Sequence, residues 1–292
     1  MDTPQQPPLV ATRKNHQPDP PRNHVMARAM RRLRRALSGA CYRTYFLLAH
    51  ANYDRRLLAT RKRTPGGTIR TYDLYNRHGR HGMLAALLDH CGPTATVYDV
   101  GASVGVYALS LTADAPDRRV VAYEPAPPTA ARLRANVAAT EPAGGLEVRP
   151  VGLGETVGEQ PFYVSTLPEL SGFDPESATR WGGLVSSVAT VEQCRLDDEV
   201  GHRRPDGTVR PPPDVLKLDV EGAEADVIRG GRETIRRHRP TLFVEVHEEG
   251  LSDSPAERLQ AELCALGYRI ETYGSYWRCE PVDPADEPAS QC

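Results

Sequence analysis

The sequence predicts an α/β fold built on a mostly parallel, doubly wound sheet. The first observation is a regular alternation of strand-like and helix-like runs, with strands expected at 96–101, 119–124 and 146–151 and helices expected at 104–113 and 128–139. The second is that two of these strands carry an acidic residue near their end, with glycine two residues after the first acid and proline directly after the second. Alternation of this kind is typical of parallel strands joined by crossover helices.

The stretch from Val97 to Gly105, VYDVGASVG, is the most informative part of the chain. A β-branched run carrying Asp99 ends in two glycines four residues apart, where a strand is expected to turn into a helix. The next strand ends in Glu124. Since carboxyl ends of neighbouring parallel strands meet at one sheet edge, we expect Asp99 and Glu124 to lie side by side where open α/β sheets bind ligands. Glu124 is then placed to accept hydrogen bonds from a ribose diol.

The glycine spacing separates two cofactor classes. A dinucleotide fingerprint needs G-x-G-x-x-G, whereas Gly101 and Gly105 give G-x-x-x-G, with no glycine at 103 or 106. An acid two residues before the first glycine and an acid closing the next strand form a pattern similar to that of class I S-adenosylmethionine-dependent methyltransferases. A plain strand-to-helix turn without a ligand stays open on this motif alone.

Two further motifs lie downstream. The segment 214–224, DVLKLDVEGAE, reads as a strand that ends in three closely spaced acids, and 240–247, PTLFVEVH, reads as another strand with a polar end. Together with the two earlier strand ends, they resemble the FkbM-type methyltransferase family over roughly residues 78–275. The resemblance implies a Rossmann-like fold, S-adenosylmethionine as cofactor, and methyl transfer to a hydroxyl of a sugar or polyketide-like acceptor.

The expected cofactor site follows from combining the first motif with this resemblance. It comprises the turn and the two acidic strand ends, namely Asp99, Gly101, Ala102, Ser103, Gly105 and Glu124.

Methyl transfer to a hydroxyl needs a base, because a protonated alcohol is a poor nucleophile. The candidates are Asp219 and His247, at the ends of the fourth and fifth strands, together with Glu245, which shares a strand face with His247. Lys217 likewise lines up with Asp219, and it is expected to pair with Glu245 if both strand faces meet the same helix layer.

A divalent metal is the alternative explanation for this group of polar residues. Its ligands would be Asp219, Glu221, Glu245 and His247. No ligand spacing typical of a metal site supports it, so no metal is predicted.

The alternation stops between residues 152 and 213, where strands are expected at 160–165 and 187–193. Insertions at the carboxyl edge of such sheets often shape the acceptor pocket. The candidate acceptor contacts are Phe173, Trp181 and Ser186 of this region, with Glu221 from the following motif. An ordinary surface loop is the alternative. Beyond it we expect a helix at 225–238, a helix at 254–266 and a terminal antiparallel hairpin of strands 268–273 and 276–280.

Composition divides the chain into four segments: a disordered tail at 1–24, a basic helical region at 25–77, the methyltransferase domain at 78–280 and a flexible tail at 281–292. Residues 1–63 carry 14 Lys/Arg against three Asp, a balance of +11, which leaves −13 for the rest. Two roles stay open for the basic helix over residues 25–60. Either its apolar stripe packs on the catalytic domain, or its arginines bind an anionic membrane surface or an acidic partner.

The sequence therefore predicts an S-adenosylmethionine-dependent O-methyltransferase acting on a sugar, glycoconjugate or other small molecule. A non-catalytic S-adenosylmethionine-binding module, or transfer to another acceptor atom, stays open. Nucleic acid is not expected as a partner, since neither an Asn/Asp-Pro-Pro-Tyr motif nor a Pro-Cys pair is present. No apolar run reaches the roughly 18 residues of a membrane span. The expected location is the cytoplasm, with peripheral membrane contact if the basic helix binds lipid.

Overall fold

The computed structural model describes residues 44, 48, 49, 51–74, 82–140, 144–167, 170–204, 206–246 and 255–282. The chain divides into two units, Met1–Leu48 and Ala49–Cys292, and the account below concerns the second. The expected tail at 1–24, most of the basic helix at 25–60, the candidate base His247 and residues 283–292 lie outside the described residues.

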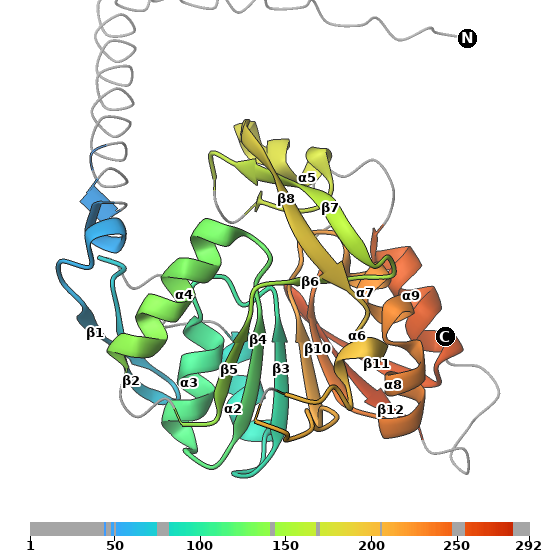
Figure 1. Cartoon of the computed structure of the whole chain (residues 1–292). Helices are drawn as coiled ribbons and strands as arrows, with labels where there is room; N and C mark the ends of the chain where they lie inside the picture. Colours follow the sequence, from blue (N-terminus) through green and yellow to red (C-terminus); the bar gives the residue numbers. More distant parts are fainter. Residues whose placement is uncertain are drawn as a thin grey trace, which may run out of the picture. The chain divides into compact units, whose positions relative to one another are not determined.

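A seven-stranded sheet with the order β11-β12-β10-β9-β3-β4-β5 forms the centre of this unit (Figure 1). Its five parallel strands are β3 (Thr96–Val100), β4 (Arg119–Tyr123), β5 (Leu146–Arg149), β9 (Val215–Leu218) and β10 (Thr241–Glu245). At one end, β12 (Tyr276–Pro281) runs antiparallel to β10, and β11 (Tyr268–Tyr273) pairs antiparallel with β12. The predicted parallel sheet with a terminal antiparallel hairpin is confirmed.

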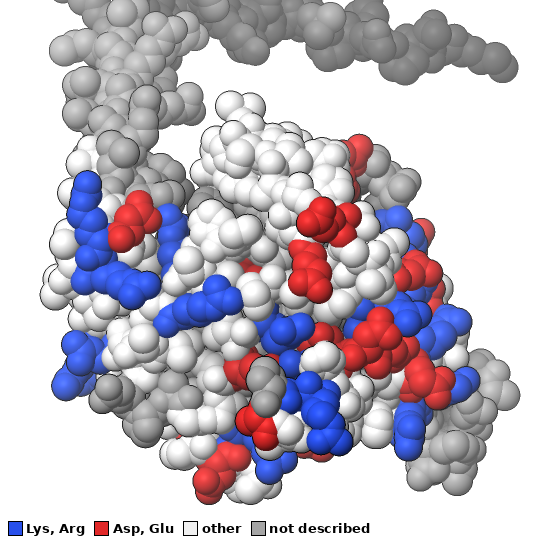
Figure 2. Space-filling view, viewed as in Figure 1, with Lys and Arg blue, Asp and Glu red and all other residues white. Residues whose placement is uncertain are grey.

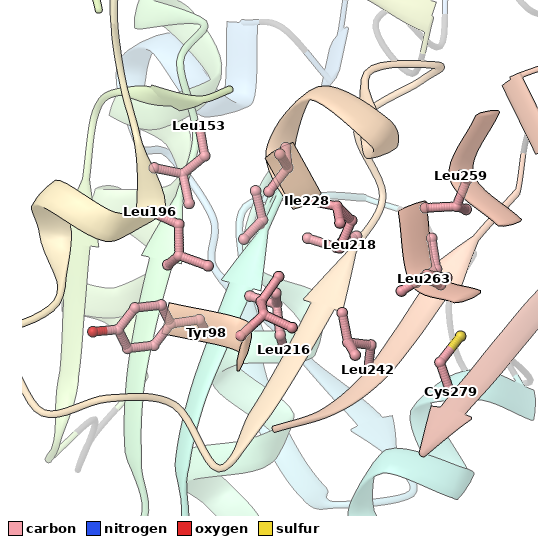
Figure 3. Close-up of a cluster of buried hydrophobic side chains, with 14 of the residues drawn as sticks. Tyr98, Leu153, Leu196, Leu216, Leu218, Ile228, Leu242, Leu259, Leu263 and Cys279 are labelled. Atoms are coloured by element: carbon pink, nitrogen blue, oxygen red, sulfur yellow. The ribbon is translucent and has the colours of Figure 1, made fainter. Parts of the chain in front are cut away.

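Helices cover both faces of the sheet because its strands bury side chains on alternate sides. Val97 and Val120 face one apolar cluster with α2 (Gly82–His90), α3 (Val106–Asp114) and α4 (Pro127–Ala139). Tyr98 and Val100 face a second cluster. That cluster packs against α6 (Leu196–Glu199), α7 (Glu224–Gly230), α8 (Arg232–His238) and α9 (Pro255–Ala265). Figure 3 shows the contributions of Leu196, Ile228 and Leu263 from α6, α7 and α9.

The region where the alternation stops forms a separate lobe, residues 152–194, here called the insertion lobe. It contains a three-stranded sheet of β6 (Gly152–Leu153), β8 (Val185–Cys194) and β7 (Gly158–Ser165), in that order, with α5 (Pro175–Thr179) and the single turn η2 (Arg180–Gly182). The strands expected at 160–165 and 187–193 correspond to β7 and β8. In Figure 1 the lobe stands above the central sheet.

The single helix expected over 225–238 is wrong, because α7 and α8 are separate helices. A Cβ on Gly230 would lie 1.9 Å from the carbonyl oxygen of Gly154, so the chain comes too close to β6 for any other residue there. Asp197 then accepts hydrogen bonds from the backbone amides of Glu233 and Thr234, at 3.2 and 2.7 Å, and caps the new helix start.

The described part of the expected basic helical region is helical at residues 51–55 and then forms an antiparallel hairpin of β1 (Thr60–Thr64) and β2 (Gly67–Thr71). This hairpin packs on α4. The amide of Arg70 donates to Thr140 Oγ1 at 3.0 Å, and the amide of Tyr72 donates to Asn136 Oδ1 at 2.9 Å. Across the described residues, no helix combines the length and apolar character needed to span a membrane.

Candidate functional site

The turn between β3 and α3 has the backbone conformation that its glycines suggest. Gly101 and Gly105 have φ of 75° and 89°, in the left-handed region. A Cβ on Gly101 would meet the carbonyl oxygen of Asp219 at 1.8 Å, and one on Gly105 would meet Leu133 Cδ1 at 2.2 Å. Gly101 is therefore required by its contact with the backbone of the residue after β9, and Gly105 is favoured by its positive φ, since the tip of a leucine side chain in α4 could move aside.

Glu124 holds the turn from the next strand. Its two carboxyl oxygens accept backbone hydrogen bonds from Ser103 and Ala126, each at 2.9 Å. The side chain lies at the wall of a cavity, and the residue is only 7% exposed. Burial raises the pKa of Glu124 to about 7, although the two backbone amides and the charge of Lys217 act in the opposite direction. Each carboxyl oxygen has a second lone pair, so a ligand hydroxyl can still donate to it.

Asp99 lies one layer below, within the sheet. It is fully buried, and its Oδ1 is 2.9 Å from the ammonium of Lys217, its direct neighbour across the β3–β9 register. Lys217 also donates to the carbonyl of Gly101 at 3.0 Å, and its ammonium lies 5.1 Å from the centre of the Tyr107 ring. The pKa of Lys217 is raised: burial acts to lower it, but the nearby carboxylates, led by Asp99, outweigh that effect.

The ion pair between Lys217 and Glu245, expected if both strand faces met the same helix layer, is wrong. The Lys217 ammonium contacts Asp99, and it lies 3.7 Å from Asp219 Oδ2. Glu245, at the end of β10, adds to the negative charge that raises the pKa of Lys217 and of Tyr107. The sequence correctly placed Lys217 and Asp219 on the same face of their strand. It did not identify Asp99 as the ion-pair partner of Lys217, because that pairing depends on which strands are neighbours in the sheet.

Two of the three acids after β9 reach the same cavity as Glu124. The side chain of Asp219 is 27% exposed, and both Asp219 and Glu221 line the cavity. The amide of Asp219 donates to the carbonyl of Val100 at 3.1 Å, which fixes this turn against the first. The third acid, Glu224, instead accepts from the amides of Val220 and Gly222 at 3.3 and 3.2 Å and so closes its own turn.

The insertion lobe is joined to this turn by contacts that the sequence analysis missed. Arg180 forms an ion pair with Glu221, and the hydroxyl of Ser177 donates to the carbonyl oxygen of Glu221. The Arg180 side chain is 1% exposed, and its Nε and Nη1 are buried without a hydrogen-bond partner among the described residues. One sequence signal was available, since Arg180 is the only Lys or Arg between residues 152 and 194.

The cavity at the carboxyl edge brings together part of the predicted site. Six of the candidates line it: Gly101, Ser103, Glu124, Phe173, Asp219 and Glu221. The other twelve lining residues were not predicted: Val100, Tyr123, Pro125, Ala126, Thr129, Val151, Gly152, Leu153, Phe162, Ser171, Gly172 and Val220. The aromatic rings of Phe162 and Phe173 meet edge to face, with centroids 5.1 Å apart, and form its wall on the insertion-lobe side.

Other candidates lie apart from this cavity. Trp181 is 66% exposed, and Ser186 is exposed and donates to the carbonyl of Val164 at 2.9 Å. Asp99 is enclosed beneath the turn, as described above. Ala102 and Gly105 belong to the turn but are not among the lining residues.

Backbone strain is concentrated near the cavity. Among the residues that the structure describes, five non-glycine residues have positive φ, and they include Ser103, Trp181 and Glu221, at 50°, 52° and 57°. Ser103 and Glu221 line the cavity, and Trp181 follows the arginine that holds Glu221. Strained positions of this kind gather at ligand and active sites, where surrounding contacts maintain them. In the part of the chain that the structure describes, no group of three or more His, Cys, Asp or Glu side chains is arranged to hold a metal.

A Rossmann-like α/β sheet with a ligand cavity at its carboxyl edge defines a class of nucleotide-binding proteins. The family model “Methyltransferase FkbM domain” matches residues 99–270. The chain therefore belongs to the FkbM family of S-adenosylmethionine-dependent methyltransferases, and the resemblance inferred from its motifs is confirmed.

Three individual relatives are 28–31% identical to the chain over the matched residues. The chain is 31% identical over 171 residues to “Methyltransferase sdnD” of Sordaria araneosa, a match covering 49% of this chain and 64% of that protein. It is 30% identical over 189 residues to “31-O-demethyl-FK506 methyltransferase FkbM” of Streptomyces tacrolimicus, covering 58% and 69%. It is 28% identical over 182 residues to “2-O-methyltransferase NoeI” of Sinorhizobium fredii, covering 59% and 70%. The match thus spans slightly less than two thirds of the Sordaria protein.

Proposed function

We propose that this protein transfers a methyl group from S-adenosylmethionine to a hydroxyl oxygen of a sugar, glycoconjugate or other small molecule. The observation that carries the proposal is the single cavity where Glu124, at the end of β4, faces the acids Asp219 and Glu221 that follow β9. The side of this cavity with Glu124 suits a nucleoside. The side with Asp219 suits the transfer of a proton from the acceptor. Two relatives whose names specify O-methyl transfer support the choice of a hydroxyl acceptor.

The residues that line the cavity suit S-adenosylmethionine in their chemistry. When bound, this cofactor supplies an electrophilic methyl group on a positively charged sulfur. Glu124 accepts hydrogen bonds from the ribose hydroxyls through its remaining lone pairs. The turn from Gly101 to Ser103 supports the nucleoside, and Phe162 and Phe173 provide apolar walls. The carboxylates of Asp219 and Glu221 suit a cationic ligand.

Asp219 is the residue we assign to proton transfer. It is partly exposed at the cavity, and a carboxylate can accept the hydroxyl proton as the new carbon–oxygen bond forms. Bound S-adenosylmethionine would supply the methyl group, and the electron pair of the broken carbon–sulfur bond would stay on sulfur. Lys217 positions Asp219 from below. Glu245 and His247 remain further candidates from the sequence, at the end of the neighbouring strand.

Glu221 and Arg180 place the insertion lobe over the acceptor side. Buried donors without partners are costly, at about 1–3 kcal/mol each. The Nε and Nη1 of Arg180 are such donors among the described residues, but they are enclosed in the lobe and are not among the groups that line the cavity. Trp181 and Ser186, further out on the same lobe, are proposed to contact the acceptor beyond the cavity.

The test is single-turnover transfer of a carbon-13 methyl group from labelled cofactor to a panel of acceptors, with the product's bonding atom read by NMR. The panel pairs each neutral sugar with its uronic acid and includes hydroxylated macrolides. Asp219→Asn is the control variant, which should bind cofactor and lose transfer. A methyl group on nitrogen or carbon, or cofactor binding with no transfer to any hydroxyl, would contradict the proposal and favour the two alternatives from the sequence.

The described residues also support the lipid-contact role of the basic N-terminal region. Figure 2 shows basic side chains gathered on the side of the molecule that carries β1 and β2. Arg55, Arg56 and Arg61 are exposed there, next to Leu57 and Leu58, which are 67% and 58% exposed. Arginines beside exposed leucines suit the surface of an anionic membrane.

We propose that this basic region binds anionic lipid. Co-sedimentation with vesicles containing phosphatidylserine should then occur at low salt and disappear at high salt. Equal binding to neutral vesicles, or none to either, would contradict it.

A further inference from the structure

Asn136, in the last turn of α4, is a fully buried amide side chain. Its Nδ2 donates to the carbonyl oxygen of Val104 at 2.9 Å and to the hydroxyl of Tyr53 at 3.3 Å. Its Oδ1 accepts from the backbone amide of Tyr72 at 2.9 Å. Buried polar groups need partners of this kind, so the three bonds together fix where the amide lies. One side chain thus joins three separate segments of the chain.

The first of these segments is the turn between β3 and α3. Ser103, the residue before Val104, lines the cavity and has a φ of 50°. This conformation is unfavourable for a residue with a Cβ and persists where neighbouring contacts maintain it. One such contact is the bond from the Ser103 amide to Glu124, at 2.9 Å. The other is the bond from Asn136 to the next carbonyl, so Glu124 and Asn136 hold the strained residue from its two sides.

The other two partners of Asn136 belong to the N-terminal segment 51–74, which lies beside α4 (Figure 1). The rings of Tyr53 and Tyr72 are in contact, with centroids 6.2 Å apart. Asn52 Nδ2 donates to the carbonyl oxygen of Tyr72 at 2.6 Å and ties the helical start of the segment to the end of β2. The segment therefore meets Asn136 as one connected body, and its docking on α4 orients the amide.

We propose that Asn136 is a positioning residue for cofactor binding, through which the docked β1–β2 hairpin holds the turn at Ser103 in the conformation that receives the nucleoside. The proposal rests on the cofactor site proposed above. It gives the hairpin, whose residues are not among those that line the cavity, an influence on the affinity for S-adenosylmethionine. By linkage, cofactor binding stabilises the docked hairpin in return.

The test compares two variants of α4 that both loosen the hairpin. Asn136→Leu replaces the amide by an apolar side chain of similar size and removes the bond to Val104 as well as those to the hairpin. The matched control is Thr140→Val, one turn further along the chain. Thr140 Oγ1 accepts from the amide of Arg70 at 3.0 Å and donates to the carbonyl oxygen of Arg70 at 2.8 Å, so both bonds are to the hairpin and neither reaches the turn.

Titration calorimetry with S-adenosylhomocysteine is performed at a temperature at which wild type and both variants are folded. Asn136→Leu is expected to weaken binding by about tenfold, within the range typical of coupling between two sites. Thr140→Val is expected to lower the melting temperature but to keep the affinity within about twofold of wild type, because it leaves Asn136 bonded to the turn. Unchanged affinity in Asn136→Leu, or an equal loss in both variants, would overturn the proposal.

Hydrogen exchange tests the reverse effect in the wild-type protein, and it decides the proposal even if Asn136→Leu does not fold. The Tyr72 amide is held by Asn136 Oδ1, so saturating S-adenosylhomocysteine is expected to slow its exchange by about tenfold. Exchange at Tyr72 that is the same with and without the ligand would overturn the proposal while leaving the cofactor site intact. A wild type that binds no S-adenosylhomocysteine would overturn both.

Discussion

Glu124→Gln is expected to remove a pH dependence from cofactor binding. In the free protein, burial raises the pKa of Glu124 to about 7, so the carboxyl group is partly protonated at neutral pH. Ribose hydroxyls donate most strongly to the ionised form, so binding shifts the equilibrium toward the carboxylate and releases a proton. By linkage, cofactor affinity should rise with pH up to about 7, by as much as about tenfold per unit, or about 1.4 kcal/mol.

The raised pKa of Glu124 also makes the free energy of unfolding of the ligand-free protein depend on pH. An acid whose folded-state pKa is raised contributes stability at low pH that is lost as pH rises through the folded value. Between the ordinary value of 4.5 and about 7, this amounts to about 3 kcal/mol. The free energy of unfolding of wild type should fall by about that amount relative to Glu124→Gln over this range.

Titration calorimetry with S-adenosylhomocysteine measures the effect on binding. The ratio of wild-type to variant affinity should increase about tenfold between about pH 6 and about pH 8, because ionisation of the ligand itself affects both proteins equally. A ratio that stays constant over this range would refute the assignment of Glu124 to the ribose.

The remaining predictions concern chemistry, stability and the turn. Asp219→Asn should lower turnover by about 10²-fold or more while cofactor affinity changes only a few-fold, and an equal loss of both would argue against proton transfer. Arg210 is 2% exposed and pairs with Glu199 at 2.7 Å, so Arg210→Ala should cost about 3–5 kcal/mol in chemical denaturation, a much larger loss than that of the exposed Arg195→Ala. Gly101→Ala should prevent stable folding, since its Cβ would lie 1.8 Å from the Asp219 carbonyl. Soluble protein with wild-type melting would contradict this contact.

Much of the fold could be predicted because its signals are local. β-branched runs marked the central strands, and the acids after them marked the carboxyl edge. The prediction that Glu124 lies beside the β3–α3 turn needed only the order of two strands, and the hydrogen bond to Ser103 agrees with it.

The features that could not be predicted depend on distant contacts. At the break between α7 and α8, Gly230 lies against Gly154 and Asp197 caps the start of α8, and both partners are far away in the sequence. The partner of Lys217 follows from the register of β3 against β9. The Arg180–Glu221 pair joins an irregular lobe to a strand end, and no periodicity connects those two residues.

A crystal structure of the protein with S-adenosylhomocysteine tests the central claim most directly. The account predicts the ligand in the carboxyl-edge cavity, with both ribose hydroxyls within hydrogen-bond distance of Glu124 and its sulfur on the side of Asp219. Ligand density elsewhere, such as in the cavity at the opposite sheet edge lined by Arg119, Glu147 and Arg204, would contradict it. So would a ribose in the expected cavity that makes no contact with Glu124.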